Sequence, residues 1–232
     1  LMMQCGTKPV HSKHRLLATI AWQIGDAISY ALEGSVFSAG SAVQWLRDGL
    51  GLIVEASETE ELAQQVESTD GVVFVPAFTG LGAPYWDSQA RGALFGVSRG
   101  TGRPHLTRAV LESVAFQTRD VVEAMASDLG ASPLLLRVDG GMSANSWLMQ
   151  FQANTLGVPV ERPKVVESTA FGAVALAALG LGWLQSPQDL LRYREVDQVF
   201  EAGTPDPAGY ALWKRAVERS RSWLEPSGRN GL

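Results

Sequence analysis

Hydrophobic and polar residues alternate over short distances in the first third of the chain, a pattern typical of β-strands. The alternation predicts strands at residues 1–4, 15–24 and 27–32. A glycine-containing turn, Gly25-Asp26, separates the second strand from the third. We therefore expect the chain to begin with three short strands that are close together in sequence.

A helical spacing follows these strands. Apolar residues recur at alternating steps of four and three, which predicts an amphipathic helix that ends near Gly49 or Gly51. The residues of this stripe are Leu32, Val36, Ala39, Val43, Leu46 and Leu50. The polar residues 55–70 predict a further, exposed helix that is rich in carboxylates.

Strand-like and helix-like segments alternate in the rest of the chain. The predicted strands are residues 71–78, 134–138 and 158–162. One predicted helix begins after Pro104 and ends at Gly130. Three further helices are predicted over residues 143–156, 170–184 and 205–224. Because residues 134–138 are almost all apolar, we expect that strand in a central sheet. The small-residue segment 170–184 is expected to be a buried helix.

Three strands followed by strands and helices in alternation is the element order of the ribonuclease-H-like fold. This fold is used as a paired domain in actin, heat-shock chaperone ATPases and sugar kinases. The expected fold class is therefore α/β, an actin-like ATPase domain with a central mixed sheet flanked by helices.

Composition narrows the class of protein further. The 232 residues are 46% hydrophobic and 19% charged, which is ordinary for a packed globular protein and excludes a disordered or fibrous chain. A net charge of −5 disfavours nucleic acid as a partner. No segment reaches the ~20 apolar residues of a membrane-spanning helix, so we expect no membrane insertion and a cytoplasmic location. One cysteine and three scattered histidines predict no metal site built from this chain.

The sharpest chemical feature is the segment LLLRVDGGMSAN, residues 134–145. A strand that runs through Gly140 and Gly141 into a helix is typical of phosphate binding, because glycine lets the backbone approach and the helix start offers free N–H groups. Asn145 lies four residues after Gly141, so both are expected on one side of the helix. The alternative is a tight turn in which Asp139 caps the helix.

Gly40 and Gln44 form a second pair with the same spacing. Glycine inside a helix is unfavourable by about 1 kcal/mol relative to alanine, so close approach of a flat ring or of another helix is needed to explain it. The carboxamide of Gln44 matches the donor and acceptor of an adenine edge. Helix packing is the competing explanation for this pair.

Other polar and aromatic features favour structural roles. The carboxylates Asp87, Glu112 and Asp120 are expected to form salt bridges or caps, and Tyr85 and Trp86 are expected to pack within their loop. The basic residues of the last helix are expected to face solvent; these are Lys214, Arg215, Arg219 and Arg221.

Longer motifs resemble the FGGY carbohydrate kinase family. Residues 92–112 fit its C-terminal signature, with Gly92, Leu94, Gly96 and Val97 followed by His105-Leu106 and then Ala109-Val110-Leu111-Glu112. The loop FTGLGAPYWDSQARGALFG, residues 78–96, resembles the version found in family members that phosphorylate glycerol rather than xylulose or gluconate. The resemblance covers nearly the whole chain and is weakest from Asp197 onward.

The resemblance implies that residues 1–232 are the C-terminal, nucleotide-binding half of such a kinase. It implies a core over residues 1–197 and a C-terminal helix and tail over 198–232. Carried over by motif, the residues that bind ATP or ADP with Mg²⁺ are Gly40, Val43, Gln44, Gly140, Gly141 and Asn145. The catalytic aspartate, the polyol-binding side chains and a glycine–threonine–glycine phosphate hairpin are expected before Leu1, so no catalytic or metal-binding residue is assigned within this chain.

The implied reaction is transfer of the ATP γ-phosphoryl group to glycerol, giving glycerol 3-phosphate. The family also implies a homodimer or homotetramer, and this half alone is expected to be inactive. Two alternatives stay open at this point: another sugar kinase of the family, and a stand-alone nucleotide-binding module without catalytic activity.

Overall fold

A computed structural model describes residues 1–224 of the chain. Its N-terminal sheet contains β1 (Met2–Gly6), β2 (Leu17–Ile24) and β3 (Ala27–Glu33). The three predicted strands are thus confirmed. All pairings are antiparallel and the order is β1-β3-β2, so β3 lies in the centre and one edge of β1 pairs with no strand among the described residues.

The first helix begins later than the apolar stripe predicts. α1 (Gly40–Gln44) continues directly into a π-helical turn, η1 (Trp45–Gly49). Leu32, the first residue of the predicted stripe, instead belongs to β3 and is fully buried. Leu32 is buried as part of a sheet, and its spacing from the helical residues that follow fits a helix only by chance. Gly40 is consequently the first helical residue and not an interior one.

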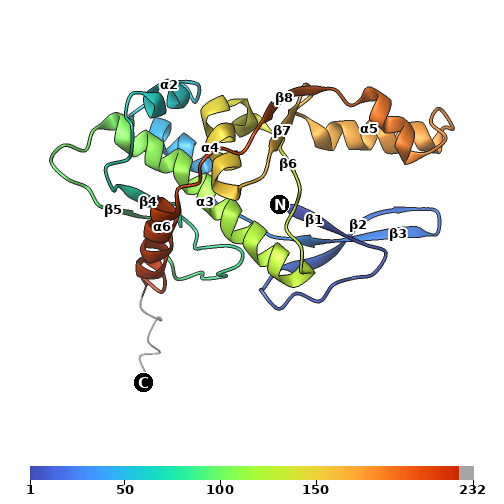
Figure 1. Ribbon diagram of the computed structural model, residues 1–232, viewed down its shortest axis with the longest axis horizontal. Helices are drawn as coiled ribbons and strands as arrows, with labels where there is room; N and C mark the ends of the chain where they lie inside the picture. Colours follow the sequence, from blue (N-terminus) through green and yellow to red (C-terminus); the bar gives the residue numbers. More distant parts are fainter. Residues whose placement is uncertain (225–232) are drawn as a thin grey trace, which may run out of the picture.

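A small helix and a hairpin-like pair precede the main helix. α2 (Glu58–Gln64) lies within the predicted polar segment, and β4 (Val73–Val75) pairs antiparallel with β5 (Ala93–Phe95). The long α3 (Arg103–Leu129) follows; it starts after Gly102 with a proline in its first turn and ends at Gly130, whose φ is 69°. Figure 1 shows α3 running through the middle of the molecule. The prediction for this helix is confirmed.

The second three-stranded sheet has the order β6-β7-β8. Its strands are β6 (Leu136–Arg137), β7 (Val160–Pro163) and β8 (Val196–Phe200), with β6 and β7 parallel and β8 antiparallel to β7. The predicted strand 134–138 is shorter than expected, and Leu134 is 90% exposed. Its burial is incomplete because β6 is an edge strand with β7 as its one partner among the described residues.

Two helical segments connect β6 to β7. A 3₁₀ turn, η2 (Gly141–Ala144), is followed by α4 (Ser146–Leu156), which packs on α3 in the main hydrophobic core. The continuous helix predicted from Ser143 is therefore interrupted at Asn145, whose ψ of 103° is extended.

The prediction of a buried helix at residues 170–184 is wrong for the chain as described. α5 (Ser168–Gly180) has one buried residue, Ala175, and Trp183 beyond it is 78% exposed. The helix is apolar all round but lies at one end of the molecule, away from α2 and α6 (Figure 1), so nothing in the described chain covers most of it. The 3₁₀ helix η3 (Pro187–Tyr193) leads from it to β8.

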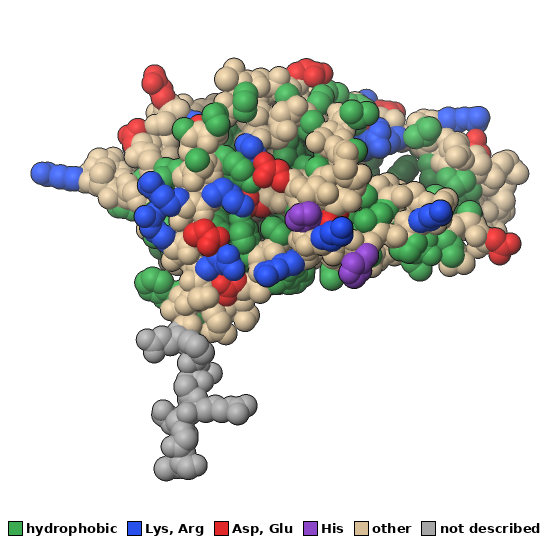
Figure 2. All heavy atoms as spheres, turned by 60° about the horizontal axis from the view of Figure 1, so that its bottom comes forward, with side chains coloured by type: hydrophobic (Ala, Val, Ile, Leu, Met, Phe, Trp, Pro, Cys, Tyr) green, Lys and Arg blue, Asp and Glu red, His purple; other side chains and the backbone are tan. Residues whose placement is uncertain are grey.

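The last helix, α6 (Pro207–Ser220), packs beside β4, where Trp213, Ala216 and Val217 are buried. No helix between residues 1 and 224 is long and apolar enough to cross a membrane. The face seen in Figure 2 mixes basic with acidic side chains instead of gathering one sign of charge.

Candidate functional site

A cavity of about 500 Å³ lies between α1, α2 and the η2–α4 junction. Its volume is within the range of small-molecule sites, roughly 300–1,000 Å³. Five of the six predicted site residues line it: Gly40, Val43, Gln44, Gly141 and Asn145. The sixth, Gly140, directly precedes η2 as its N-cap. Two segments that are about 100 residues apart in sequence thus meet at one cavity.

The two glycines of the DGG turn have different tasks. Gly140 has a φ of 78°, a left-handed conformation that glycine adopts without strain, and its N–H donates to the Val166 carbonyl at 2.9 Å. Its carbonyl accepts from the Ser143 N–H and hydroxyl, which closes the turn. At Gly141, by contrast, an added Cβ would meet no atom within 4 Å. Gly140 shapes the turn, and Gly141 leaves open space beside the cavity.

Gly40 keeps the first turn of α1 close to the second segment. A Cβ built on Gly40 would lie 3.8 Å from the side chain of Met142 in η2. Because Gly40 is the first residue of its helix, the unfavourable effect of a glycine in a helix interior does not apply to it. Its lack of a side chain keeps the wall of the cavity open between α1 and η2.

Asn145 does not sit one helical turn after Gly141. It is the N-cap of α4: its Oδ1 accepts from the Leu148 N–H at 2.8 Å, and its Nδ2 donates to Thr59 Oγ1 at 3.1 Å. Asn145 therefore caps this helix, whereas the alternative interpretation of the sequence assigned the cap to Asp139. The carboxamide is held in one orientation at the wall of the cavity, with one N–H and one lone pair left over.

Gln44 and Val43 contribute differently to the opposite wall. Val43 is buried and gives an apolar surface, whereas Gln44 is exposed at the rim and no described residue hydrogen-bonds to its side chain. One helical turn further, Arg47 also lines the cavity and forms a bidentate ion pair with Asp48. That pair raises the pKa of Arg47 and lowers the pKa of Asp48.

α2 is the part of the site that the sequence did not indicate. Ala56, Ser57, Thr59 and Glu60 line the cavity, and Thr59 is buried with its hydroxyl donating to the Ala56 carbonyl. Glu60 Oε2 accepts from the Ser146 N–H at 3.1 Å. These contacts join residues 86 positions apart. A polar segment without a motif gave no means of predicting them.

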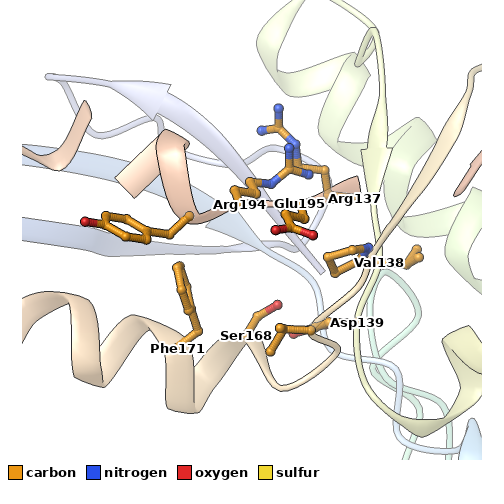
Figure 3. Close-up of a pocket in the computed structure, with 10 residues that line it drawn as sticks. Arg137, Val138, Asp139, Ser168, Phe171, Arg194 and Glu195 are labelled. Atoms are coloured by element: carbon orange, nitrogen blue, oxygen red, sulfur yellow. The ribbon is translucent and has the colours of Figure 1, made fainter. Parts of the chain in front are cut away.

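A second cavity of about 250 Å³ lies between β6, α5 and η3 (Figure 3). Its walls carry Asp139, Ser168 and Phe171 together with charges of both signs. Arg137 and Arg194 both pair with Glu161, and Lys164 pairs with Glu195. Because its charges are largely paired with one another and its volume is half that of the first cavity, we assign the nucleotide-sized site to the first.

The groups expected to be structural do have structural contacts. Asp120 is buried and accepts from Tyr85 and Tyr210 hydroxyls, Trp213 Nε1 and Lys214 Nζ at 2.6–3.1 Å. Burial and this carboxylate raise the pKa of both tyrosines, which stay protonated donors. Lys214 is exposed, as predicted, and its ammonium group also pairs with the buried Asp120.

Comparison with known proteins decides the family. A profile described as "FGGY family of carbohydrate kinases, C-terminal domain" matches residues 1–181. The chain belongs to this family. Glycerol kinase of Gloeobacter violaceus is 51% identical over 227 residues, and glycerol kinase of Pseudothermotoga lettingae is 54% identical over 230. Each match covers 97% of this chain and 46% of the relative, so the chain spans about half the length of these curated relatives.

Solved structures of family members have the same fold. A crystal structure of Plasmodium falciparum glycerol kinase with ADP superposes with a TM-score of 0.86 at 38% identity, covering 94% of this chain and 44% of the other. A ligand-bound xylulose kinase from Lactobacillus acidophilus gives a TM-score of 0.75 at 23% identity, with 94% and 43% coverage. The predicted family and the actin-like α/β fold class are confirmed.

Proposed function

We propose that this chain is the C-terminal half of an ATP-dependent glycerol kinase and binds ATP or ADP in the cavity between α1, α2 and η2. The observation that carries the proposal is that two glycine–carboxamide pairs, Gly40 with Gln44 and Gly141 with Asn145, line the same cavity. The P. falciparum relative, named as a glycerol kinase with ADP, supports nucleotide as the ligand.

Each site residue has a distinct task under this proposal. The turn at Gly140 and Gly141 lets the backbone approach the phosphates. Val43 gives the base an apolar contact, while Gln44 and Asn145 supply hydrogen bonds. Phosphoryl transfer depends on such positioning and on charge neutralisation more than on covalent chemistry.

Mg²⁺ would accompany the nucleotide. Residues 1–224 contain no group of three carboxylate, histidine or cysteine side chains that could hold a metal ion by themselves. These residues would therefore not hold the ion by themselves; it would enter with the nucleotide and would neutralise charge on the transferred group. This chain's own contribution is to hold the nucleotide.

Glycerol is the proposed acceptor because the GAPYWD loop and the 51–54% identity to two glycerol kinases both favour the glycerol-specific branch. The acid–base aspartate and the polyol-binding side chains are assigned to the other half of the longer protein. A cytoplasmic homodimer or homotetramer is the assembly that we propose for the complete enzyme.

Calorimetric titration with ADP tests the placement of the nucleotide. Gly141→Val puts a side chain into open space beside the cavity, so we expect intact folding and at least a tenfold weaker ADP affinity. Gly172→Val, the same substitution at a glycine of α5 that also has open space beside it and does not line the cavity, is the control. An unchanged ADP affinity in Gly141→Val contradicts the placement.

For the reaction, the full-length gene product should phosphorylate glycerol with ATP; turnover of xylulose or gluconate instead would contradict the proposed acceptor.

A further inference from the structure

The helix α2 is anchored in the hydrophobic core and carries Thr59 into the wall of the nucleotide cavity. Leu62 and Ala63 follow Thr59 by three and four residues, so the three side chains share one face of the helix. Leu62 and Ala63 are buried in the main core, and Thr59 is buried as well and lines the cavity. Core packing therefore gives the Thr59 hydroxyl a fixed place in that wall.

The Thr59 hydroxyl faces Asn145 as a hydrogen-bond acceptor only. It has a single hydrogen, which it donates to the Ala56 carbonyl at 2.6 Å. Its lone pairs remain for Asn145 Nδ2, which lies 3.1 Å away and donates to it. A hydroxyl whose hydrogen is already used distinguishes the two ends of a carboxamide, because it pairs with the NH₂ end and offers nothing to the oxygen end.

The oxygen end of the same carboxamide is fixed by α4. Asn145 Oδ1 accepts from the Leu148 N–H at 2.8 Å. If the amide turned over, two donors would meet at Leu148 and two acceptors would meet at Thr59. Two separate elements thus hold the carboxamide in one orientation. This orientation leaves one N–H of Nδ2 and one lone pair of Oδ1 for a ligand in the cavity that Asn145 lines.

We propose that Thr59 is a positioning residue for nucleotide binding, which holds the Asn145 carboxamide so that its remaining N–H is available to a hydrogen-bond acceptor of the nucleotide. Without the Thr59 hydroxyl, the bond to the Leu148 N–H alone would orient this side chain, and binding of ADP would have to order it. The inference rests on the proposed nucleotide site and adds to it a residue that acts through Asn145.

Calorimetric titration of substituted chains with ADP tests this role. Thr59→Val keeps the shape of the side chain without its hydroxyl, so we expect ADP affinity about fivefold weaker, as for one lost hydrogen bond. Thr59→Ala should weaken binding in the same way, whereas Thr59→Ser keeps the hydroxyl and should retain the original affinity. Thr118→Val is the matched control, because the Thr118 hydroxyl also donates to a backbone carbonyl but does not line the cavity. It should leave ADP affinity unchanged.

A thermodynamic cycle with Asn145→Ala separates positioning from a general structural effect. If Thr59 acts through Asn145, Thr59→Val should have little further effect on ADP affinity once Asn145 is replaced. Additive effects of the two substitutions overturn the inference. So does an unchanged affinity in Thr59→Val, or a Thr59→Ser variant that binds ADP as weakly as Thr59→Val.

The same titrations separate failure of the inference from failure of the site. The proposed site stands, whatever the result at Thr59, as long as Gly141→Val weakens ADP binding. If Gly141→Val leaves ADP binding unaltered, or the unsubstituted chain binds no ADP, the proposed nucleotide site is contradicted and the role of Thr59 falls with it.

Discussion

Asn145 has a structural task in the fold and, under the proposed function, a second task in binding the nucleotide. Its oxygen caps α4 through the Leu148 N–H, and its nitrogen joins α4 to Thr59 of α2. A change at this position therefore acts on the stability of the helix as well as on the cavity wall. Substitutions that separate the two tasks are more informative than alanine alone.

We predict that Asn145→Ala lowers the free energy of unfolding by about 1 kcal/mol, because it removes the N-cap. Asn145→Asp keeps an oxygen for the Leu148 N–H and should retain the cap, but it loses the donor to Thr59 and adds a charge to the cavity wall. Its ADP affinity should fall while its stability stays close to that of the unsubstituted chain. Urea denaturation and calorimetry check both parts. Equal stability losses in the two variants would contradict the capping role.

Gly141 and Asn145 line one cavity, but not through the single helix that their spacing suggested. Gly141 and Asn145 were expected on one helix, but a 3₁₀ turn and a break separate them. The prediction still succeeded in placing both at one cavity, because a tight turn returns the chain nearly as one helical turn would. Thr59 and Glu60 could not be predicted, since their partners lie 86 residues away.

At the scale of elements, hydrophobic periodicity predicted most of the helices and strands. The long α3 and the three N-terminal strands followed their patterns closely. It failed at the start of α1, where Leu32 belongs to a strand paired on both sides. It also gave no indication of β8, whose residues are mostly exposed and polar or β-branched, so that strand forms by pairing with β7 and not by burying a face.

The attachment of α6 to α3 depends on Asp120. This buried carboxylate accepts from side chains of the GAPYWD loop and of α6. We predict that Asp120→Ala lowers the free energy of unfolding by about 3–5 kcal/mol, because it leaves several buried donors without a partner. Tyr85→Phe, which removes one hydroxyl, should cost about 1 kcal/mol. Urea denaturation measures both; a loss below 1 kcal/mol for Asp120→Ala would show that α6 is held by apolar packing alone.

The hydrogen bonds of residues 12–14 to Asp128, near the end of α3, predict that the stability of the fold depends on pH. Burial acts to raise the pKa of Asp128, but hydrogen bonds from Ser12, His14 and the Lys13 N–H outweigh it, and the net pKa lies below the usual 3.8. A carboxylate with a lowered folded-state pKa stabilises the fold above its unfolded pKa, and this contribution is lost as the pH falls through the folded value.

We therefore expect the chain to lose stability as the pH is lowered from about 5 toward 3, and Asp128→Asn to lose less over the same interval. At pH 7 the variant should be about 1–2 kcal/mol less stable, since it loses charge-assisted hydrogen bonds. Denaturant unfolding at several pH values compares the two chains. Parallel pH profiles would mean that other carboxylates, and not Asp128, carry the acid sensitivity.

At the scale of the whole molecule, α5 exposes an apolar surface at one end. α5 carries no charged residue over Ser168–Gly180, and Val174 and Leu176 are 67% and 56% exposed. A helix that is apolar on all sides normally lies inside a larger protein, and extensive exposed apolar patches mark surfaces that associate. That the chain spans 46% of the length of its relatives agrees with such a surface being covered in a longer protein.

The isolated chain should accordingly bind an environment-sensitive hydrophobic dye and self-associate at micromolar concentration. Substituting Val174 and Leu176 with lysine should reduce both, because it breaks the patch on α5 and leaves the nucleotide cavity untouched. Dye fluorescence and light scattering after size exclusion measure the two effects, and ADP titration verifies that the cavity is intact. A paired substitution of Gln64 and Gln65 with lysine, both exposed outside the patch, adds the same two charges and controls for them. If that control lowers association as much as the α5 variant does, net charge and not the apolar helix governs the behaviour of the chain.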